Sequence, residues 1–302
     1  MERITENQFV GTFKNNIRLY IKREDLIHPF ISGNKFRKLF YNLSKAKEDN
    51  HATLLTFGGA YSNHIAAVAF AGKKYGFQTI GVIRGEELLS KINENPTLTF
   101  AQQNGMQFVF ESREKYRKRH ELEYIETLRE MFGYFYLIPE GGTNALAVKG
   151  CKEILTVNDA EFDYICCCVG TGGTISGIIN SSLENQKVIG FPSLKGNFLK
   201  EEIQKWVTKD NWELNHAYHF GGYAKINREL VEFMNDFFAQ TTVLLDPVYT
   251  GKMIYGIYDL IEKGYFTTNS KILAIHSGGI QGIEGMNQKL ERLNLPKIRT
   301  NV

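Results

Sequence analysis

The sequence contains no segment that suits a membrane or a nucleic acid. Its 302 residues include no apolar run long enough to cross a bilayer, and no apolar signal region follows residues 1–3. The formal net charge is only +3, and the most basic segment, residues 113–119, is interrupted by glutamate and tyrosine. We therefore expect a cytoplasmic protein whose partners are small molecules, with no membrane or nucleic-acid partner.

Cysteine is scarce, and its four copies do not form a metal-binding pattern. Cys151 stands alone, whereas Cys166, Cys167 and Cys168 are consecutive. Three consecutive residues of a strand cannot all face one metal ion, and no Cys-x-x-Cys or paired-histidine spacing accompanies them. We expect no metal site, and we interpret the thiols as small buried apolar side chains in a reducing compartment.

The composition predicts a folded globular protein. Hydrophobic residues make up 43% of the sequence and aromatic residues 13%, enough to fill a large core. The length fits one large or two medium domains. Because no linker, low-complexity segment or fixed-period repeat divides the chain, two domains would have to be interleaved rather than follow one another.

Short apolar segments alternate with helical patterns along the chain. Strands are expected at residues 17–22, 53–57, 79–84, 107–110, 136–138, 164–169, 188–191, 242–245 and 272–276. Helices are expected after residue 35 and at 65–75, 95–104, 113–131, 144–156, 175–179, 199–207, 226–238, 251–262 and 280–290. This alternation predicts an α/β fold with mostly parallel twisted sheets flanked by helices.

Lys35 stands at the start of a predicted helix. Behind it Phe36, Leu39, Phe40 and Leu43 recur at helical spacing, so the helix should lie against a core with Lys35 in its exposed first turn. The helix dipole disfavours an ammonium at that end and lowers its pKa. The position suits a nucleophilic amine, although by itself it fits a solvated surface lysine equally well.

A glycine-rich segment joins the strand at 164–169 to the next helix. It consists of Gly170, Thr171, Gly172, Gly173 and Thr174, whose backbone amides and hydroxyls at a helix start have the parts of a phosphate site. A dinucleotide fingerprint would need a third glycine and a ribose-binding acid, and a P-loop would need Gly-Lys followed by Ser or Thr; both are missing. The segment therefore predicts a smaller phosphorylated cofactor, unless it is a tight turn without a ligand.

A phosphate site combined with a reactive lysine indicates pyridoxal 5'-phosphate. Five segments, residues 32–38, 62–64, 170–174, 246–252 and 276–279, resemble the ordered signatures of the D-cysteine desulfhydrase and 1-aminocyclopropane-1-carboxylate (ACC) deaminase family. That family belongs to the tryptophan synthase β-like, fold type II pyridoxal-phosphate enzymes. The resemblance extends from about residue 17 to residue 282.

The resemblance implies an architecture as well as a cofactor. We expect a large cofactor-binding domain formed by residues 1–51 and 146–302, and a small inserted α/β domain formed by residues 52–145. The cofactor should lie between them, where loops from strand ends converge. Enzymes of this family are usually homodimers, so a homodimer is also expected.

The resemblance also assigns roles to individual residues. Lys35 would hold the cofactor aldehyde covalently and then move the Cα proton of the substrate. Asn63 would hydrogen-bond the phenolic oxygen of the cofactor, Ser62 would place a hydroxyl beside the substrate, and the amides of residues 62–64 would bind its carboxylate. By themselves, Ser62 and Asn63 would more simply be helix caps.

Two further residues complete the predicted site. Tyr249 matches a tyrosine that faces the substrate, a candidate general acid or base, and the alternative is a core tyrosine. Ser277 falls where the family places the group facing the pyridine nitrogen. A neutral hydroxyl stabilises a protonated ring less than a carboxylate does, which favours prompt loss of a good β-leaving group.

The same resemblance favours one substrate over another. The deaminases typically carry glutamate at position 250 and leucine at position 277, whereas this chain has Thr250 and Ser277, and His64 is typical of the desulfhydrases. We therefore expect β-elimination of hydrogen sulfide from D-cysteine, giving pyruvate and ammonia. The alternatives are ACC deamination and a non-catalytic ligand-binding protein on the same scaffold. Tyr61 and the apolar residues 65–67 depart from the family pattern, so the substrate pocket could differ.

Overall fold

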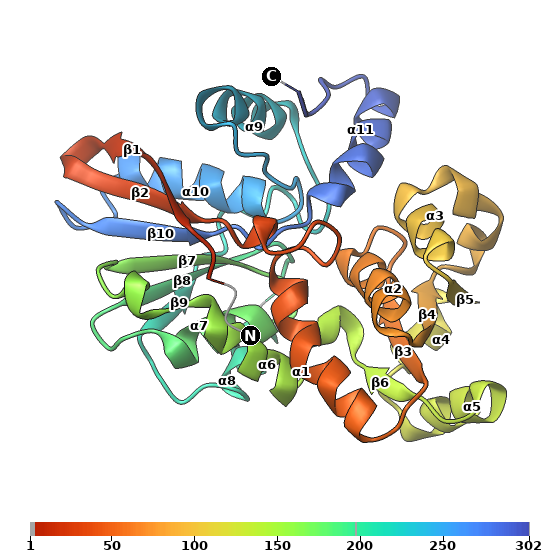
Figure 1. The fold of residues 1–302 in the computed structure, drawn as a ribbon. Helices are drawn as coiled ribbons and strands as arrows, with labels where there is room; N and C mark the ends of the chain where they lie inside the picture. Colours follow the sequence, from red (N-terminus) through yellow and green to blue (C-terminus); the bar gives the residue numbers. More distant parts are fainter. Residues whose placement is uncertain (1–3, 197, 302) are drawn as a thin grey trace.

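The computed structural model describes residues 4–196 and 198–301 and contains two twisted sheets (Figure 1). The larger has the strand order β1-β2-β10-β7-β8-β9 and the smaller the order β5-β4-β3-β6. The strands of the larger sheet are β1 (Asn7–Phe13), β2 (Ile17–Lys22), β7 (Tyr164–Val169), β8 (Lys187–Pro192), β9 (Trp212–Leu214) and β10 (Lys271–Ile275). Those of the smaller are β3 (Thr53–Gly58), β4 (Gln78–Arg84), β5 (Met106–Glu111) and β6 (Tyr136–Ile138). Among the described strands, all pairings except β1–β2 are parallel, which confirms the predicted fold class.

Helices cover both faces of the larger sheet (Figure 1). On one face lie α9 (Arg228–Thr241), α10 (Thr250–Glu262) and α11 (Ile283–Arg292), and on the other α6 (Ala145–Cys151), α7 (Gly173–Ser181) and α8 (Phe198–Gln204). Strand β7 contributes to both cores, because Cys166 and Cys168 face the α10 side whereas Cys167 faces the α7 side. A continuous apolar strand is what a parallel sheet with two covered faces requires.

The smaller sheet is covered in the same way. Its helices are α2 (Asn63–Tyr75), α3 (Pro96–Gln103), α4 (Arg113–Arg117) and α5 (Leu122–Phe132). Helix α1 (Asn34–Glu48) packs against both α2 and α6, and therefore joins the two halves of the molecule. The short 3-10 turns are η1 (Lys14–Asn16), η2 (Glu24–Leu26), η3 (Glu86–Glu94), η4 (Glu140–Gly142), η5 (Lys152–Ile154), η6 (Val157–Asp159) and η7 (Ile280–Gly282). The division of the chain into domains at residues 51/52 and 145/146 stays a prediction.

Four local predictions differ from the structure. Residues 7–13, expected to be irregular, form β1, which pairs with β2 through a turn where Asn15 and Asn16 adopt left-handed conformations. Strand β9 was also not predicted, because its three residues are only half-buried and include the polar Glu213 in the middle, whereas the equally short β6 is apolar throughout. Residues 242–245 are buried at Val243 and Leu245 but form no strand, and the helix expected at 113–131 is broken into α4 and α5.

The structure also bears on the features that the sequence lacks. All four cysteines are free and buried. Within residues 4–196 and 198–301, no helix is long and apolar enough to cross a membrane. Over the same residues, no group of three or more His, Cys, Asp or Glu side chains is arranged to hold a metal ion.

Candidate active site

The predicted site residues meet in a cavity between the two sheets. It lies where β7 and β10 end and where α1, α2, α7 and α10 begin, the edge at which parallel sheets commonly bind ligands. The lining residues are Asn34, Lys35, Lys38, Asn63, Gly141, Cys168, Val169, Gly170, Thr171, Gly172, Thr174, Ile175, Tyr249, Ser277 and Gly278. Of the predicted residues, Ser62 and Gly173 do not line this cavity.

A glycine brings the lysine helix onto the end of β10. Gly33 precedes α1 with a φ of 58°, and a Cβ on it would lie 1.9 Å from the carbonyl oxygen of Ser277. The amide of Asn34 donates to that same oxygen at 3.2 Å. A side chain at position 33 would therefore push α1 away from the sheet, and the close approach places Lys35 over the strand end.

Lys35 is half-buried rather than exposed, which corrects the first-turn expectation. Burial first, and then the nearby ammonium of Lys38, lower the pKa of its ammonium to about 7. Its Nζ donates to the side-chain oxygen of Asn34 at 3.4 Å. At neutral pH a large fraction of Lys35 is therefore a neutral, nucleophilic amine. Burial is a stronger cause of the lowered pKa than the helix dipole alone.

Removing the Lys38 charge is expected to raise the pKa of Lys35. In the cofactor-free protein, Lys35 should react with pyridoxal, which lacks the phosphate, at a rate that rises with pH through a midpoint at about 7 and levels off above it. In Lys38→Met the midpoint should move to higher pH, whereas Lys47→Met, an exposed position on the same helix, should leave it unchanged. A wild-type midpoint near that of a free lysine would contradict the assignment.

The glycine-rich loop has the features of an anion site. Gly172 adopts a left-handed conformation with a φ of 85°, and α7 begins at the next residue. In the described structure, the amides of residues 172–175 donate to no backbone carbonyl or side chain. Free amides at the start of a helix are suited to bind a phosphate, so this loop fits the phosphate group of the implied cofactor.

Neighbouring side chains fix this loop. The hydroxyl of Thr174 accepts a hydrogen bond from the Asn34 side chain at 2.7 Å, which ties α7 to α1. The hydroxyls of Thr171 and Thr143 lie 2.7 Å apart. Lys38 is 2% exposed, and its Nζ donates to Thr143 at 3.2 Å and to the Gly141 carbonyl at 2.9 Å. Burial lowers the pKa of Lys38, and a bound phosphate near the loop would favour its charged form.

Asn63 lines the cavity, whereas Ser62 does not. The Asn63 side-chain oxygen accepts a hydrogen bond from Gln281 at 2.6 Å, which leaves its amide group as a donor for the cavity. Ser62 caps α2, with its hydroxyl accepting from the amides of His64 at 3.2 Å and Ile65 at 3.4 Å. The amide donor of Asn63 suits the anionic ring oxygen of the cofactor, whereas the contacts of Ser62 are those of a helix cap. The predicted role of Ser62 beside the substrate stays a prediction.

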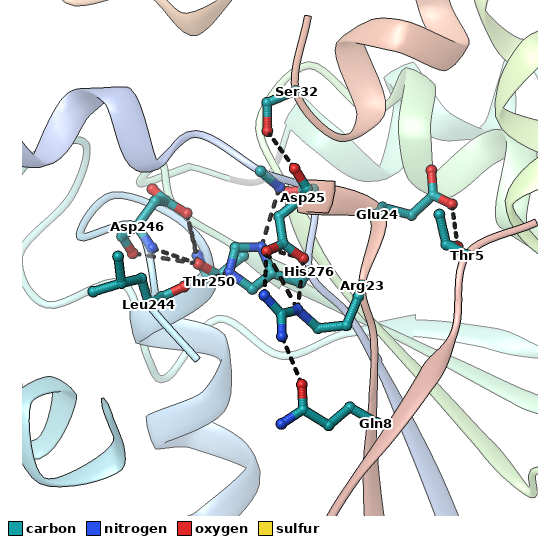
Figure 2. A network of polar contacts seen from close by, with 12 residues as sticks. Thr5, Gln8, Arg23, Glu24, Asp25, Ser32, Leu244, Asp246, Thr250 and His276 are labelled. Carbon is teal, nitrogen blue, oxygen red and sulfur yellow. Dashed lines mark hydrogen bonds and ion pairs between the residues drawn. The ribbon is translucent and has the colours of Figure 1, made fainter. Parts of the chain in front are cut away.

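Asp246 holds Tyr249 in place at the start of α10. Its carboxylate accepts hydrogen bonds from the amides of Val248 and Tyr249, both at 2.9 Å, and from the amide of Thr250 at 2.7 Å. The Thr250 hydroxyl also donates to it at 2.8 Å (Figure 2). Thr250 is therefore fully buried and engaged away from the cavity, whereas the Tyr249 ring borders the cavity beside Gly170.

Tyr249 has a partner that the sequence did not indicate. The ring of Tyr223 lies 6.1 Å from that of Tyr249, with the two ring planes at 68°. Burial raises the pKa of Tyr249 well above its ordinary value, and the Tyr223 phenol adds to this rise. Tyr249 is therefore protonated at neutral pH and suits a proton donor better than a base.

A buried network surrounds His276, the residue that precedes Ser277 (Figure 2). His276 accepts a hydrogen bond from the Gly278 amide at its Nδ1, and its Nε2 donates to the Leu244 carbonyl at 2.6 Å. The Asp25 carboxylate lies 3.9 Å from Nδ1, and Arg23 binds that carboxylate through two nitrogens. These contacts fix the turn in which Ser277 follows β10.

Sequence reasoning missed several residues that border the site. Asn34 stands next to Lys35 and was not assigned a role, and Tyr223 lies in a loop with no helical or strand period. Cys168 was interpreted as apolar filler, and it is buried as expected, but it also lines the cavity. The sequence signal that could have identified one of these residues is a polar side chain next to a motif residue. Among Asn34, Tyr223 and Cys168, it applies to Asn34 alone.

Comparison with known proteins tests what this cavity resembles. A family model described as pyridoxal-phosphate dependent enzyme matches residues 7–278. The chain belongs to that family. The free amides at α7, the Asn63 amide donor and the half-buried Lys35 are the groups that would hold the phosphate, the ring oxygen and the aldehyde of the cofactor.

The relatives within this family agree on the reaction class. A putative ACC deaminase of Pyrococcus horikoshii is 33% identical over 295 residues, which cover 90% of this chain and 87% of the relative. The bifunctional D-cysteine desulfhydrase/ACC deaminase of Arabidopsis thaliana is 30% identical over 89% of this chain and 74% of its own length. The chain is therefore related to pyridoxal-phosphate dependent lyases and deaminases, as predicted.

Solved structures confirm the fold of the pyridoxal-phosphate enzyme. The crystal structure of an ACC deaminase homologue matches with a TM-score of 0.80 and 29% identity, over 96% of this chain and 94% of that one. A hydrogen sulfide-producing enzyme from Fusobacterium nucleatum matches with a TM-score of 0.67 at 14% identity, which speaks for the fold alone. Both matches agree with the fold type II architecture.

Proposed function

We propose that this pyridoxal-phosphate enzyme eliminates hydrogen sulfide from D-cysteine. The observation that carries the proposal is the lack of an acidic side chain in the cavity lining: in the described part of the chain no aspartate or glutamate borders it, and the side chain that follows β10 is the Ser277 hydroxyl. A hydroxyl stabilises a protonated pyridine ring less than a carboxylate would. Such a site favours substrates with a good β-leaving group over ring opening without one.

The residues around the cavity supply the proton transfers. Pyridoxal phosphate, when bound, supplies an aldehyde that links to amines and a ring that withdraws electrons from Cα. Lys35, with its pKa lowered to about 7, is suited to take the Cα proton of the substrate and to pass it on to another acceptor atom. Tyr249, protonated because burial raises its pKa, is suited to donate a proton to the departing sulfur. Hydrolysis then consumes one water and gives pyruvate and ammonia.

An assay with D-cysteine tests the substrate. The purified holoenzyme is expected to release sulfide and pyruvate in equal amounts from D-cysteine, and Tyr249→Phe should lower kcat by about 10²-fold because the proton donor is lost. The readouts are sulfide by methylene blue formation and pyruvate by coupled reduction. Phe at position 249 keeps the ring contact with Tyr223, so cofactor binding serves as the internal control. Absence of both products from D-cysteine would exclude this substrate.

ACC deamination is the second candidate, and the relatives support it equally. ACC deaminase appears in the names of both relatives described above, and one of them carries both activities. Release of 2-oxobutanoate from ACC at a higher kcat/KM than sulfide release from D-cysteine would favour the deaminase. Cofactor binding without turnover of either compound would favour a ligand-binding protein on this scaffold. We further propose a homodimer, which sedimentation of the holoenzyme would test.

A further inference from the structure

A thiol and a hydroxyl meet at the ends of two neighbouring strands. Strands β7 and β10 are parallel neighbours, with Ile275 paired to Cys167. Beyond this pair, the sulfur of Cys168, one residue after Cys167, lies 3.0 Å from the side-chain oxygen of Ser277, two residues after Ile275. Both residues are buried, and both line the cavity that contains Lys35. The contact therefore belongs to the active-site cavity rather than to the core beneath it.

The direction of the Ser277 hydroxyl depends on this contact. A serine hydroxyl has one hydrogen to donate and two lone pairs, and a thiol can act as a weak donor or a weak acceptor. Among residues 4–196 and 198–301, the structure gives the Ser277 side-chain oxygen no other hydrogen-bond partner. Cys168 is thus the group that can determine whether Ser277 presents its hydrogen or its lone pairs to the cavity.

The chemistry of the pair favours one arrangement. An oxygen accepts a hydrogen bond better than a sulfur does, so the thiol hydrogen should point to the oxygen of Ser277. The hydroxyl hydrogen is then free to point into the cavity, where it suits an unprotonated ring nitrogen. We propose that Cys168 is a positioning residue that directs the Ser277 hydroxyl toward the cofactor ring as a hydrogen-bond donor.

The neighbouring cysteines show that this role is specific to one position. Cys166 faces the same side of β7 but is enclosed by the apolar core, and Cys167 faces the opposite side. Neither of them lines the cavity. An apolar side chain would fill the place of Cys168 equally well, but it would leave Ser277 without this partner.

Single and double variants of the holoenzyme test the proposal. Cys168→Ala is expected to shift the visible absorption maximum of the bound cofactor and to lower kcat about three- to tenfold with little change in KM, as loss of one hydrogen bond predicts. Cys168→Ser, which restores a donor, should recover both properties. In a Ser277→Ala background, Cys168→Ala should have no further effect, because its action passes through that hydroxyl. Cys166→Ala is the matched control and should leave the spectrum unchanged.

Three outcomes would overturn the proposal. They are an unshifted spectrum in Cys168→Ala, additive effects of Cys168→Ala and Ser277→Ala, and loss of the fold in both Cys168 variants by thermal unfolding, since the last would show a packing role alone. The inference rests on the proposed placement of Ser277 against the ring, not on the choice of substrate. Because the spectrum of the resting holoenzyme is measured without substrate, failure of the D-cysteine proposal would leave this test unaffected.

Discussion

Replacing Lys35 by alanine is expected to abolish the visible absorption band of the bound cofactor and to lower turnover on the order of 10³-fold or more. Two roles are lost together. Lys35 is a cavity amine whose pKa is lowered to about 7, and we propose that it provides both the covalent attachment of the aldehyde and the base for the Cα proton. The measurements are the absorption spectrum after dialysis against excess cofactor and the rate of keto acid formation.

Lys38 is the alternative that this experiment must separate from Lys35. It lines the same cavity, but its Nζ is held by the Gly141 carbonyl and the Thr143 hydroxyl, so it is not free to reach the aldehyde. Lys38→Ala should therefore weaken cofactor binding without removing the band at saturation. Persistence of the band in Lys35→Ala would move the covalent attachment to another lysine, and the central assignment would fail.

The largest effect on stability is expected from Glu24→Gln. Glu24 is fully buried and accepts two hydrogen bonds from Arg37, both at 2.9 Å, and a third from Thr5 at 2.7 Å. Arg37 is 4% exposed and lies in α1, two residues after Lys35. Neutralising Glu24 removes the closer of the two carboxylates paired with Arg37, since that of Glu153 lies 4.0 Å from the guanidinium, and this should lower the free energy of unfolding by about 3 to 5 kcal/mol.

An exposed pair on the same helix provides the control. Lys45 and Asp49 form an ion pair at 2.6 Å in which both side chains are exposed to solvent. Because solvent screens such pairs, Asp49→Asn should cost no more than about 0.5 kcal/mol. Denaturant unfolding of both variants compares the two effects. If Glu24→Gln proved as mild as Asp49→Asn, the anchoring of α1 by this pair would be refuted.

Much of the fold was predictable because it repeats a pattern. Strands such as β3 and β7 are fully or almost fully buried segments that run into glycine-rich turns, and helices with long buried segments follow them. The errors occur where the pattern is short or misleading. Strand β1 is interrupted by an irregularity near Val10, and residues 242–245 contain the buried apolar side chains Val243 and Leu245 but form no strand.

The site was predictable to the extent that its residues lie in ordered motifs. Lys35, Asn63, Tyr249 and Ser277 all reach one cavity, as the resemblance implied. The partners that set their chemistry are far apart in sequence and carry no motif of their own. Tyr223 is the clearest example, because a loop residue comes to lie against Tyr249 only when the chain has folded.

The sequence by itself determined the family, the cofactor and the lysine that should hold it, because each depends on side chains in a fixed local order. The tertiary structure decided how those groups are tuned. The pKa of Lys35 falls to about 7 because the folded chain buries it beside the charge of Lys38. Cys168 meets Ser277 because β7 and β10 pair in register across more than one hundred residues of chain. Burial and contact between distant residues are properties of packing, and no local pattern encodes them.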